Sequence, residues 1–129
     1  MKLVSGIDLV EINRITSLKT TIKDRFVQRI LTENERKEHL QDQSIAGIFA
    51  AKEATAKALG CGIGIVSWQE IEILPDSHGT PGLLLTGNAL RKASDLGISI
   101  WSVSITHTTE LAAAQVVGIG QENESINNQ

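Results

Sequence analysis

Residues 49–60 have the sequence Phe49-Ala50-Ala51-Lys52-Glu53-Ala54-Thr55-Ala56-Lys57-Ala58-Leu59-Gly60, which predicts a helix of small residues with only three charges. Glu53 and Lys57 are four positions apart and share one helical face, whereas Lys52 lies about 100° away around the axis. The alanines keep the surface of this helix low, so another backbone or a bulky ligand can approach it closely. Alternatively, the charges form a solvated face with one ion pair, which stabilises a helix by only ~0.2–0.5 kcal/mol.

A second notable carboxylate, that of Asp8, lies in the segment Leu3-Val4-Ser5-Gly6-Ile7-Asp8-Leu9-Val10-Glu11-Ile12. The alternating aliphatic residues predict an opening strand over residues 3–10, with Gly6 and Asp8 on the same face. An ionised carboxylate between apolar neighbours is costly unless a cation or hydrogen-bond donors meet it. Gly6 leaves room on that face for something to approach. Alternatively, Asp8 ends the strand and caps a helix that starts near Glu11.

The whole pattern predicts an α+β fold, a single domain with an antiparallel sheet and one long central helix. Further strands are expected at 70–74, 83–85, 98–106 and 111–117, the last two forming a hairpin. Helices are expected near 11–18, at 21–30, from Thr32 to about Leu40, at about 44–59 and at 87–96. Thr32 and Glu35 form a predicted capping box, Ser44 is a possible N-cap of the long helix, and Gly60 ends that helix.

Length and composition narrow the class of protein. The chain has 129 residues, a hydrophobic share of 41% and a net charge of −3, which suits one globular domain and argues against a basic nucleic-acid-binding protein. No apolar run approaches the ~20 residues of a membrane span, and no signal-peptide pattern opens the chain. The single cysteine, Cys61, suggests a cytoplasmic protein. We expect a domain over residues 1–119 and a polar, disordered tail over 120–129.

The two charged segments together resemble the signatures of holo-acyl-carrier-protein synthases, the phosphopantetheinyl transferases of bacterial fatty acid synthesis. Residues 6–15, Gly6-Ile7-Asp8-Leu9-Val10-Glu11-Ile12-Asn13-Arg14-Ile15, resemble the opening signature. Residues 49–58 resemble the second signature, an aromatic residue followed by Lys-Glu-Ala and a further Lys. Segments 25–32, 60–64 and 102–108 also occur in the expected order, so the resemblance covers roughly residues 3–118.

The resemblance implies an activity, the transfer of phosphopantetheine from coenzyme A to a serine of acyl carrier protein, with magnesium and release of adenosine bisphosphate. It also implies a phosphopantetheinyl-transferase-like fold and a homotrimer with active sites between subunits. It places His107 and Thr108 near the phosphates of the coenzyme, although a histidine at a turn is more often a structural residue.

Asp8 and Glu53 are the predicted magnesium ligands, because Mg²⁺ prefers oxygen donors and is commonly held by one or two carboxylates together with substrate phosphates. We expect Lys57 to reach a bridging or leaving phosphate oxygen, with a plain salt bridge to Glu53 as the alternative. Lys52 is expected to be a second phosphate contact. Two groups remain candidates for the base that accepts the serine proton, Glu53 and a water molecule on the metal.

Arg14, Arg25 and Arg29 belong to a locally basic segment, and Arg25 and Arg29 share a predicted helix face. Such residues are commonly plain surface charges. A rigid basic face would also attract an acidic protein, so we expect these three arginines to contact the carrier protein.

Two positions depart from the family pattern. Ile48 stands where relatives usually have Arg, and Thr80, in Gly79-Thr80-Pro81, stands where they have Lys or Arg. Both changes predict weaker contacts with coenzyme phosphates, and an Arg restored at position 48 would then tighten coenzyme binding. They also leave an alternative function open, a catalytically weak module that binds coenzyme A or a carrier protein.

Overall fold

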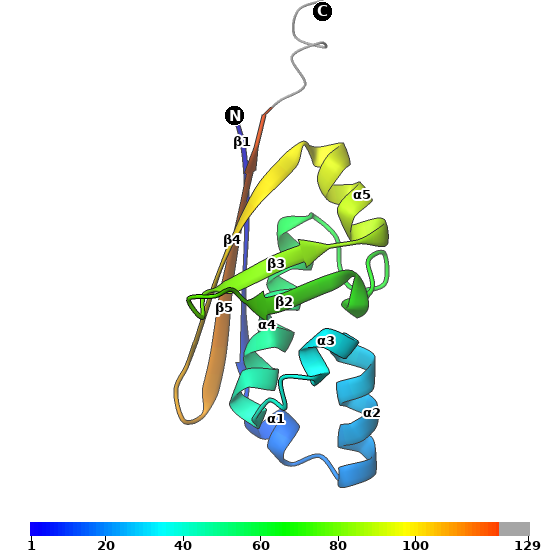
Figure 1. The fold of residues 1–129 in the computed structure, drawn as a ribbon, viewed down its shortest axis with the longest axis vertical. Helices are drawn as coiled ribbons and strands as arrows, with labels where there is room; N and C mark the ends of the chain where they lie inside the picture. Colours follow the sequence, from blue (N-terminus) through cyan, green and yellow to red (C-terminus); the bar gives the residue numbers. More distant parts are fainter. Residues whose placement is uncertain (122–129) are drawn as a thin grey trace, which may run out of the picture.

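Three long antiparallel strands form the main sheet of the molecule (Figure 1). In the computed structural model, which describes residues 1–121, they are β1 (Lys2–Glu11), β4 (Ile98–His107) and β5 (Leu111–Gly120). β5 lies between the other two, so the first and last strands of the chain are neighbours. Asp8 of β1 is opposite Ala114 of β5, and burial alternates along β1, with Gly6, Asp8 and Val10 on the more buried face.

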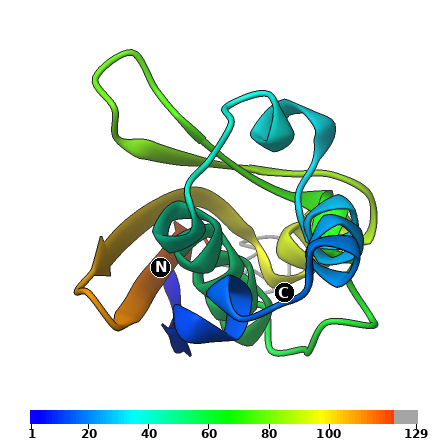
Figure 2. The same ribbon diagram turned by 90° about the horizontal axis from the view of Figure 1, so that it is seen from below.

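The long helix α4 (Asp42–Ala58) packs against one face of this sheet and is seen almost end-on near the centre of Figure 2. A Cβ atom at Gly6 would collide with the carbonyl oxygen of Ala54, so the room at Gly6 admits the backbone of α4. The predicted cap at Ser44 is wrong, because the backbone is already helical from Asp42 and Gln41 is the N-cap. Gly60 follows the end of the helix with a φ of 75°, as predicted.

Smaller elements surround α4 on the sides that the sheet leaves open. They are α1 (Asn13–Thr16), α2 (Thr20–Ile30), α3 (Glu33–Arg36), the 3₁₀ helix η1 (Trp68–Glu70), β2 (Ile71–Pro75), β3 (Pro81–Leu85) and α5 (Gly87–Leu96). β2 and β3 form a separate antiparallel pair, drawn in green in front of α4 in Figure 1.

Two helices are shorter than predicted. The helix expected near 11–18 is reduced to α1, because β1 continues to Glu11. The N-cap of α1 is Ile12, so Asp8 lies within β1 and caps no helix. The helix expected from Thr32 to Leu40 ends at Arg36, and His39 has a φ of 51°, outside the helical region. The predicted capping box of Thr32 and Glu35 is present.

The fold is therefore α+β with antiparallel sheets and one long central helix, as predicted. Its core is largely aliphatic, with one aromatic group in which the ring of Phe49 lies 5.5 Å from Phe26 and 5.0 Å from Trp68, measured between centroids. No helix within residues 1–121 is long and apolar enough to cross a membrane. The predicted tail begins inside β5, at Gly120, and its residues 122–129 lie outside the described part of the chain.

Candidate active site

Asp8, Glu53 and Lys57 come together where β1 packs on α4. Lys57 Nζ donates a hydrogen bond to Asp8 Oδ1 at 2.9 Å and another to the carbonyl oxygen of Ile7 at 3.0 Å. Lys57 therefore forms its ion pair with Asp8 and does not form the alternative salt bridge to Glu53. The Lys57 side chain is 53% exposed and that of Asp8 is 19% exposed, so this ion pair is open to a ligand.

Glu53 is half-buried, and the charges of neighbouring side chains affect its ionisation. Burial raises the pKa of the Glu53 carboxyl, and the negative charge of Asp8 raises it further. The positive charges of Lys57 and Arg14 act in the opposite direction. Two carboxylates that repel one another in a partly buried site favour the binding of a cation between them.

The donor set at this position fits Mg²⁺. Asp8 and Glu53 offer hard carboxylate oxygens, and residues 1–121 hold no cluster of three or more His, Cys, Asp or Glu that would enclose a metal ion completely. Mg²⁺ rarely needs such a cage, because it keeps several waters and uses substrate phosphates as ligands. The ammonium of Lys57 already lies at Asp8 Oδ1, which shows that a cation can be accommodated at this carboxylate.

His107 and Thr108 lie at the turn between β4 and β5, both exposed. They border a cavity of about 490 Å³ together with Ile12, Gln43 and Thr109. β5 separates β4 from β1, so one chain does not bring His107 into contact with Asp8. Of the predicted coenzyme contacts, Lys57 therefore lies beside the metal ligand Asp8, whereas His107 and Thr108 lie on the other side of β5.

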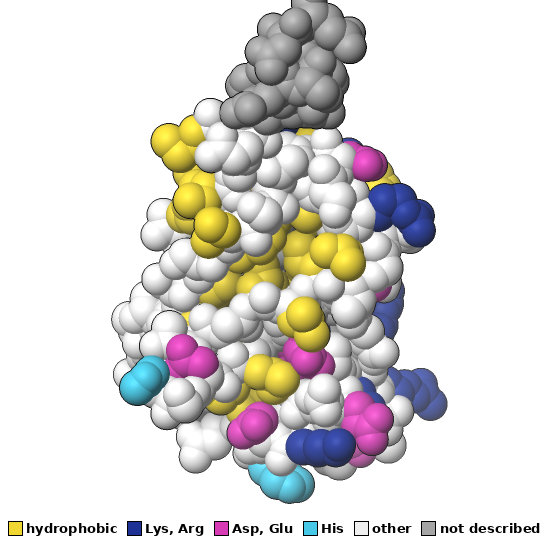
Figure 3. All heavy atoms as spheres, turned by 45° about the horizontal axis from the view of Figure 1, so that its top comes forward, with side chains coloured by type: hydrophobic (Ala, Val, Ile, Leu, Met, Phe, Trp, Pro, Cys, Tyr) yellow, Lys and Arg dark blue, Asp and Glu magenta, His cyan; other side chains and the backbone are white. Residues whose placement is uncertain are grey.

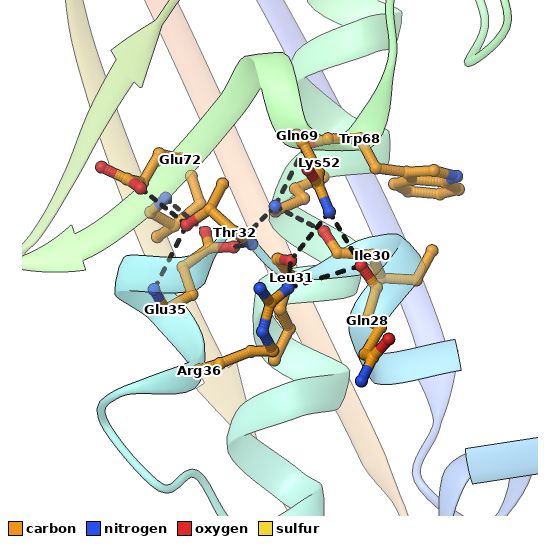
Figure 4. Close-up of polar contacts among 11 residues, drawn as sticks. Gln28, Ile30, Leu31, Thr32, Glu35, Arg36, Lys52, Trp68, Gln69 and Glu72 are labelled. Carbon is orange, nitrogen blue, oxygen red and sulfur yellow. Dashed lines mark hydrogen bonds and ion pairs between the residues drawn. The ribbon is translucent and has the colours of Figure 1, made fainter. Parts of the chain in front are cut away.

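Lys52 lies in the interior of the molecule, and its predicted contact with a phosphate is wrong (Figure 4). Its side chain and that of Glu35 are both 0% exposed, with 2.7 Å between Nζ and Oε1. Burial lowers the pKa of Lys52, while the negative charge of Glu35 opposes this shift. The physical reason is the rotation of about 100° per helical residue, which turns Lys52 away from the open face that Glu53 borders.

The three arginines that we expect to contact a partner are all exposed, Arg14 on α1 and Arg25 and Arg29 on α2. None of them forms an ion pair with an acidic side chain of residues 1–121. The guanidinium of Arg14 lies 5.8 Å from the centroid of the Phe49 ring. In Figure 3 most of the visible Lys and Arg side chains lie along the right-hand side, where α2 and α5 are found in Figure 1.

Arg14 and Phe49 also border an apolar cavity of about 380 Å³ whose lining includes Val10 and Phe26. Val10 follows Asp8 by two positions on the inner face of β1, and Phe49 precedes Glu53 by one turn of α4. The cavity is therefore lined in part by the same two elements that carry the carboxylates, β1 and α4.

The two departures from the family pattern lie in different environments. Ile48 is only 8% exposed and belongs to the hydrophobic core, which argues against the prediction that an Arg at this position would improve coenzyme binding. An Arg there would have to bury a charge. Thr80 is exposed in the turn between β2 and β3, where it does not affect packing of the core.

Sequence reasoning missed the pairing of Lys52 with Glu35. A signal was present, because the helical neighbours of Lys52 at three and four positions on either side are Ile48, Phe49, Thr55 and Ala56, none of them charged. A lysine surrounded in this way on a helix is expected to be buried and to need a carboxylate.

Comparisons with known proteins identify relatives over nearly the whole chain. The model of the 4'-phosphopantetheinyl transferase superfamily matches residues 5–115. A holo-[acyl-carrier-protein] synthase of Herpetosiphon aurantiacus is 46% identical over 92% of this chain and 99% of its own length. One of Solidesulfovibrio magneticus is 48% identical over 87% of this chain and 94% of its own. The crystal structure of the Helicobacter pylori enzyme in complex with coenzyme A superposes with a TM-score of 0.80 at 36% identity, covering 89% of this chain and 99% of that one.

Proposed function

The chain belongs to the 4'-phosphopantetheinyl transferase superfamily, and we propose that Asp8, Glu53 and Lys57 carry out its reaction. The chain is a holo-[acyl-carrier-protein] synthase, which transfers phosphopantetheine from coenzyme A to a serine of acyl carrier protein for fatty acid synthesis. The observation that carries our assignment of the site is the convergence of two carboxylates and a half-exposed lysine at the contact of β1 with α4.

The reaction breaks one phosphorus–oxygen bond and forms another. The serine Oγ attacks the phosphorus that bears the pantetheine arm, and the hydroxyl proton passes to a base. The bridging bond of the pyrophosphate breaks, and adenosine 3',5'-bisphosphate leaves with the bridging oxygen. The site must therefore orient a pyrophosphate, accept one proton and stabilise negative charge on the leaving oxygen.

Each of the three residues has a chemical property that suits one of these tasks. Asp8 and Glu53 would hold Mg²⁺, which when bound supplies charge neutralisation and orientation of the phosphates. Lys57 has two protein acceptors within residues 1–121, so one of its three N–H groups remains available for a phosphate oxygen. A carboxylate has two oxygens, so one oxygen of Glu53 could bind the metal while the other accepts the serine proton, and we assign the role of base to Glu53.

The coenzyme contacts at His107 and Thr108 require a second copy of the chain in this proposal. Leu3, Ile7 and Leu9 of β1 and Ile100 of β4 are 61–67% exposed on the sheet face that α4 does not cover. An apolar face of this kind usually marks an interface. A homotrimer would cover this face and place His107 of one copy beside Asp8 of the next. A single free cysteine, Cys61, is compatible with work in the reducing cytoplasm.

Arg14, Arg25 and Arg29 would attract acyl carrier protein through its acidic side chains. They are exposed and unpaired with acids in the described residues, so binding breaks no existing ion pair. Arg14 also connects the two sites, because its charge acts on Glu53. A carrier protein docked on these arginines would present its serine next to the carboxylates.

The direct test is mass spectrometry of an apo acyl carrier protein incubated with this chain, coenzyme A and Mg²⁺. We expect the carrier to gain the mass of one phosphopantetheine group and the gain to disappear when a chelator removes the metal. A carrier protein that binds but gains no mass would instead support the alternative of a binding module. A gain that persists with chelator would contradict the role of Asp8 and Glu53 as metal ligands.

A further inference from the structure

The buried pair of Lys52 and Glu35 and its hydrogen bonds join five elements of the chain, α2, α3, α4, η1 and β2 (Figure 4). Lys52 Nζ donates to the carbonyl oxygens of Ile30, the last residue of α2, at 2.7 Å and of Trp68, in η1, at 3.1 Å, and to Glu35 Oε1 at 2.7 Å. These three bonds use all the donors of the ammonium. The lysine therefore ties α4 to the end of α2 and to η1.

Both carboxylate oxygens of Glu35 also accept hydrogen bonds. Its Oε1 also accepts a hydrogen bond from the backbone N–H of Thr32 at 2.7 Å, and its Oε2 accepts one from the backbone N–H of Ile73 in β2 at 2.7 Å. The Thr32 hydroxyl donates to Glu72 Oε2 at 2.6 Å, which extends the network along β2. No buried side-chain nitrogen or oxygen in the described residues lacks a partner, so the network is complete.

A buried ion pair of this kind is poorly explained by stability alone. Removing two charges from water is costly, and a well-packed pair of apolar residues often stabilises a fold as much or more. What a saturated polar network does provide is one fixed geometry, because any other arrangement leaves a buried group without a partner. The function of this network is therefore to be sought in the elements that it holds in place.

Two of those elements, α4 and α2, carry residues of the proposed site. Lys52 is bonded covalently to Glu53 in α4, and Ile30 ends the helix that presents Arg25 and Arg29. Around the axis of α4, Ala54 lies about 200° from Lys52, and Ala54 is where Gly6 of β1 makes its close contact. Lys52 and Ala54 thus fix α4 from nearly opposite sides, with Glu53 between them.

We propose that Lys52 and Glu35 are positioning residues that hold the basic face of α2 in register with the reactive carboxylate of α4. They touch neither substrate and act through the backbone of Ile30 and the rotation of α4. The proposal rests on the proposed function, because it assigns Glu53 to the reaction and Arg25 and Arg29 to the carrier protein. It predicts that loss of the pair harms the carrier-dependent step and spares coenzyme binding.

The test compares Lys52→Met with Ile71→Ala, a matched control that removes a fully buried side chain of β2 outside the polar network. Both variants are expected to lose stability, so both are assayed at a temperature where near-ultraviolet circular dichroism shows that they are folded. We expect Lys52→Met to lose about tenfold or more in kcat/KM for the carrier protein, and a tenfold loss corresponds to an activation free energy about 1.36 kcal/mol higher. Its Kd for coenzyme A should change less than threefold, and Ile71→Ala should retain both values within about twofold.

Two outcomes would overturn the proposal. Wild-type kcat/KM in folded Lys52→Met would show that the pair only stabilises the fold. A loss of coenzyme affinity as large as the loss of kcat/KM would show that Lys52 contributes to coenzyme binding. If Lys52→Met does not fold, Thr32→Val replaces it, because this variant removes one hydroxyl from the network and keeps the ion pair. Thr32→Val should also lower kcat/KM for the carrier protein, by a smaller factor. An unchanged kcat/KM in Thr32→Val would equally contradict the proposal.

Hydrogen exchange supplies a readout that does not depend on catalysis. Amides at the end of α2, residues 27–31, should exchange faster in Lys52→Met than in Ile71→Ala at equal global stability. Inactive wild-type protein would contradict the proposed function while leaving this comparison intact. Equal exchange in the two variants, with wild-type protein active, would contradict the positioning role alone.

Discussion

Helix α4 contributes a lysine to each of two ion pairs that have nearly the same geometry and opposite surroundings. The nitrogen–oxygen distance is 2.7 Å for Lys52 and Glu35 and 2.9 Å for Lys57 and Asp8. Both side chains of the first pair, the inner pair, are 0% exposed. In the second pair, the outer pair, Lys57 is 53% exposed and Asp8 is 19% exposed. The inner ammonium is saturated by protein acceptors and the outer one is not. The nitrogen–oxygen distance therefore does not distinguish the roles of these two ion pairs. The exposed fraction of the side chains and the number of ammonium donors already in use do distinguish them.

The largest expected effect is on stability and separates the two lysines. Lys52→Met leaves the Glu35 carboxylate buried without its cation, so it should lower the free energy of unfolding by ~3–5 kcal/mol. Lys57→Met removes the exposed partner of a partly exposed pair and should change the free energy of unfolding by about 1 kcal/mol or less. Urea denaturation of both variants measures the difference. Equal losses would mean that burial does not distinguish these pairs.

The next largest effect is on turnover and belongs to the two carboxylates beside Lys57. Asp8→Asn and Glu53→Gln each remove one charged oxygen donor and preserve volume, so each should slow carrier modification by roughly 10²–10³-fold with the fold intact. Asp95→Asn on α5, an exposed carboxylate far along the chain, is the matched control and should be unaffected. Full activity of either variant at saturating Mg²⁺ would exclude that residue as a metal ligand.

Charge reversal on the basic residues extends the comparison to α2, the helix that Lys52 holds, and to Arg14 on α1. Arg14→Glu, Arg25→Glu or Arg29→Glu should each raise KM for the carrier protein about threefold to tenfold and leave coenzyme binding unchanged. Arg91→Glu on α5 is the control. The effect should shrink as salt is added, because screening already weakens the exposed contacts that the change removes. Weaker coenzyme binding with unchanged carrier KM would show that the basic face serves the other substrate.

The smallest effect concerns the cost of keeping Glu53 ionised. The pKa of Glu53 is raised in the folded protein, so ionisation of this carboxyl lowers the free energy of unfolding. This loss of stability is absent below the pKa of the unfolded state, about 4.3, and is complete once pH has risen through the pKa of the folded state. Glu53→Gln should therefore be more stable than wild type at neutral pH, and the gain should fade as pH is lowered toward about 4. Thermal unfolding across this range measures the gain. A difference that does not vary with pH would contradict this account.

The outer pair was accessible to sequence reasoning because both of its residues follow from local periodicity. Alternation in β1 assigns Asp8 to the face that α4 covers, and the four-residue spacing assigns Glu53 and Lys57 to one side of α4. The approach of strand and helix was also indicated, since Gly6 and the alanines offer little obstruction. Only the pairing differed, because Lys57 reaches across to Asp8 instead of bonding along its own helix.

The inner pair depends on contacts that no local pattern encodes. Glu35 was predicted correctly as part of a capping box, yet its second role requires that α3 and α4 meet 17 residues apart in sequence. Ile48 was misread for a similar reason. Its position next to Phe49 in a family signature suggested a ligand contact, whereas the tertiary packing of α4 turns it into the core.

The separation of Asp8 from His107 by β5 bears on how the protein behaves when it is diluted. In the proposed homotrimer each active centre is shared between two copies, so it exists only while those copies remain associated. By mass action, specific activity should then fall at low protein concentration, and the rate should rise more steeply than linearly as concentration recovers. Sedimentation measured over the same concentrations would follow the trimer and the activity together. Catalysis would in that case respond to how much of the protein is made, as well as to its substrates.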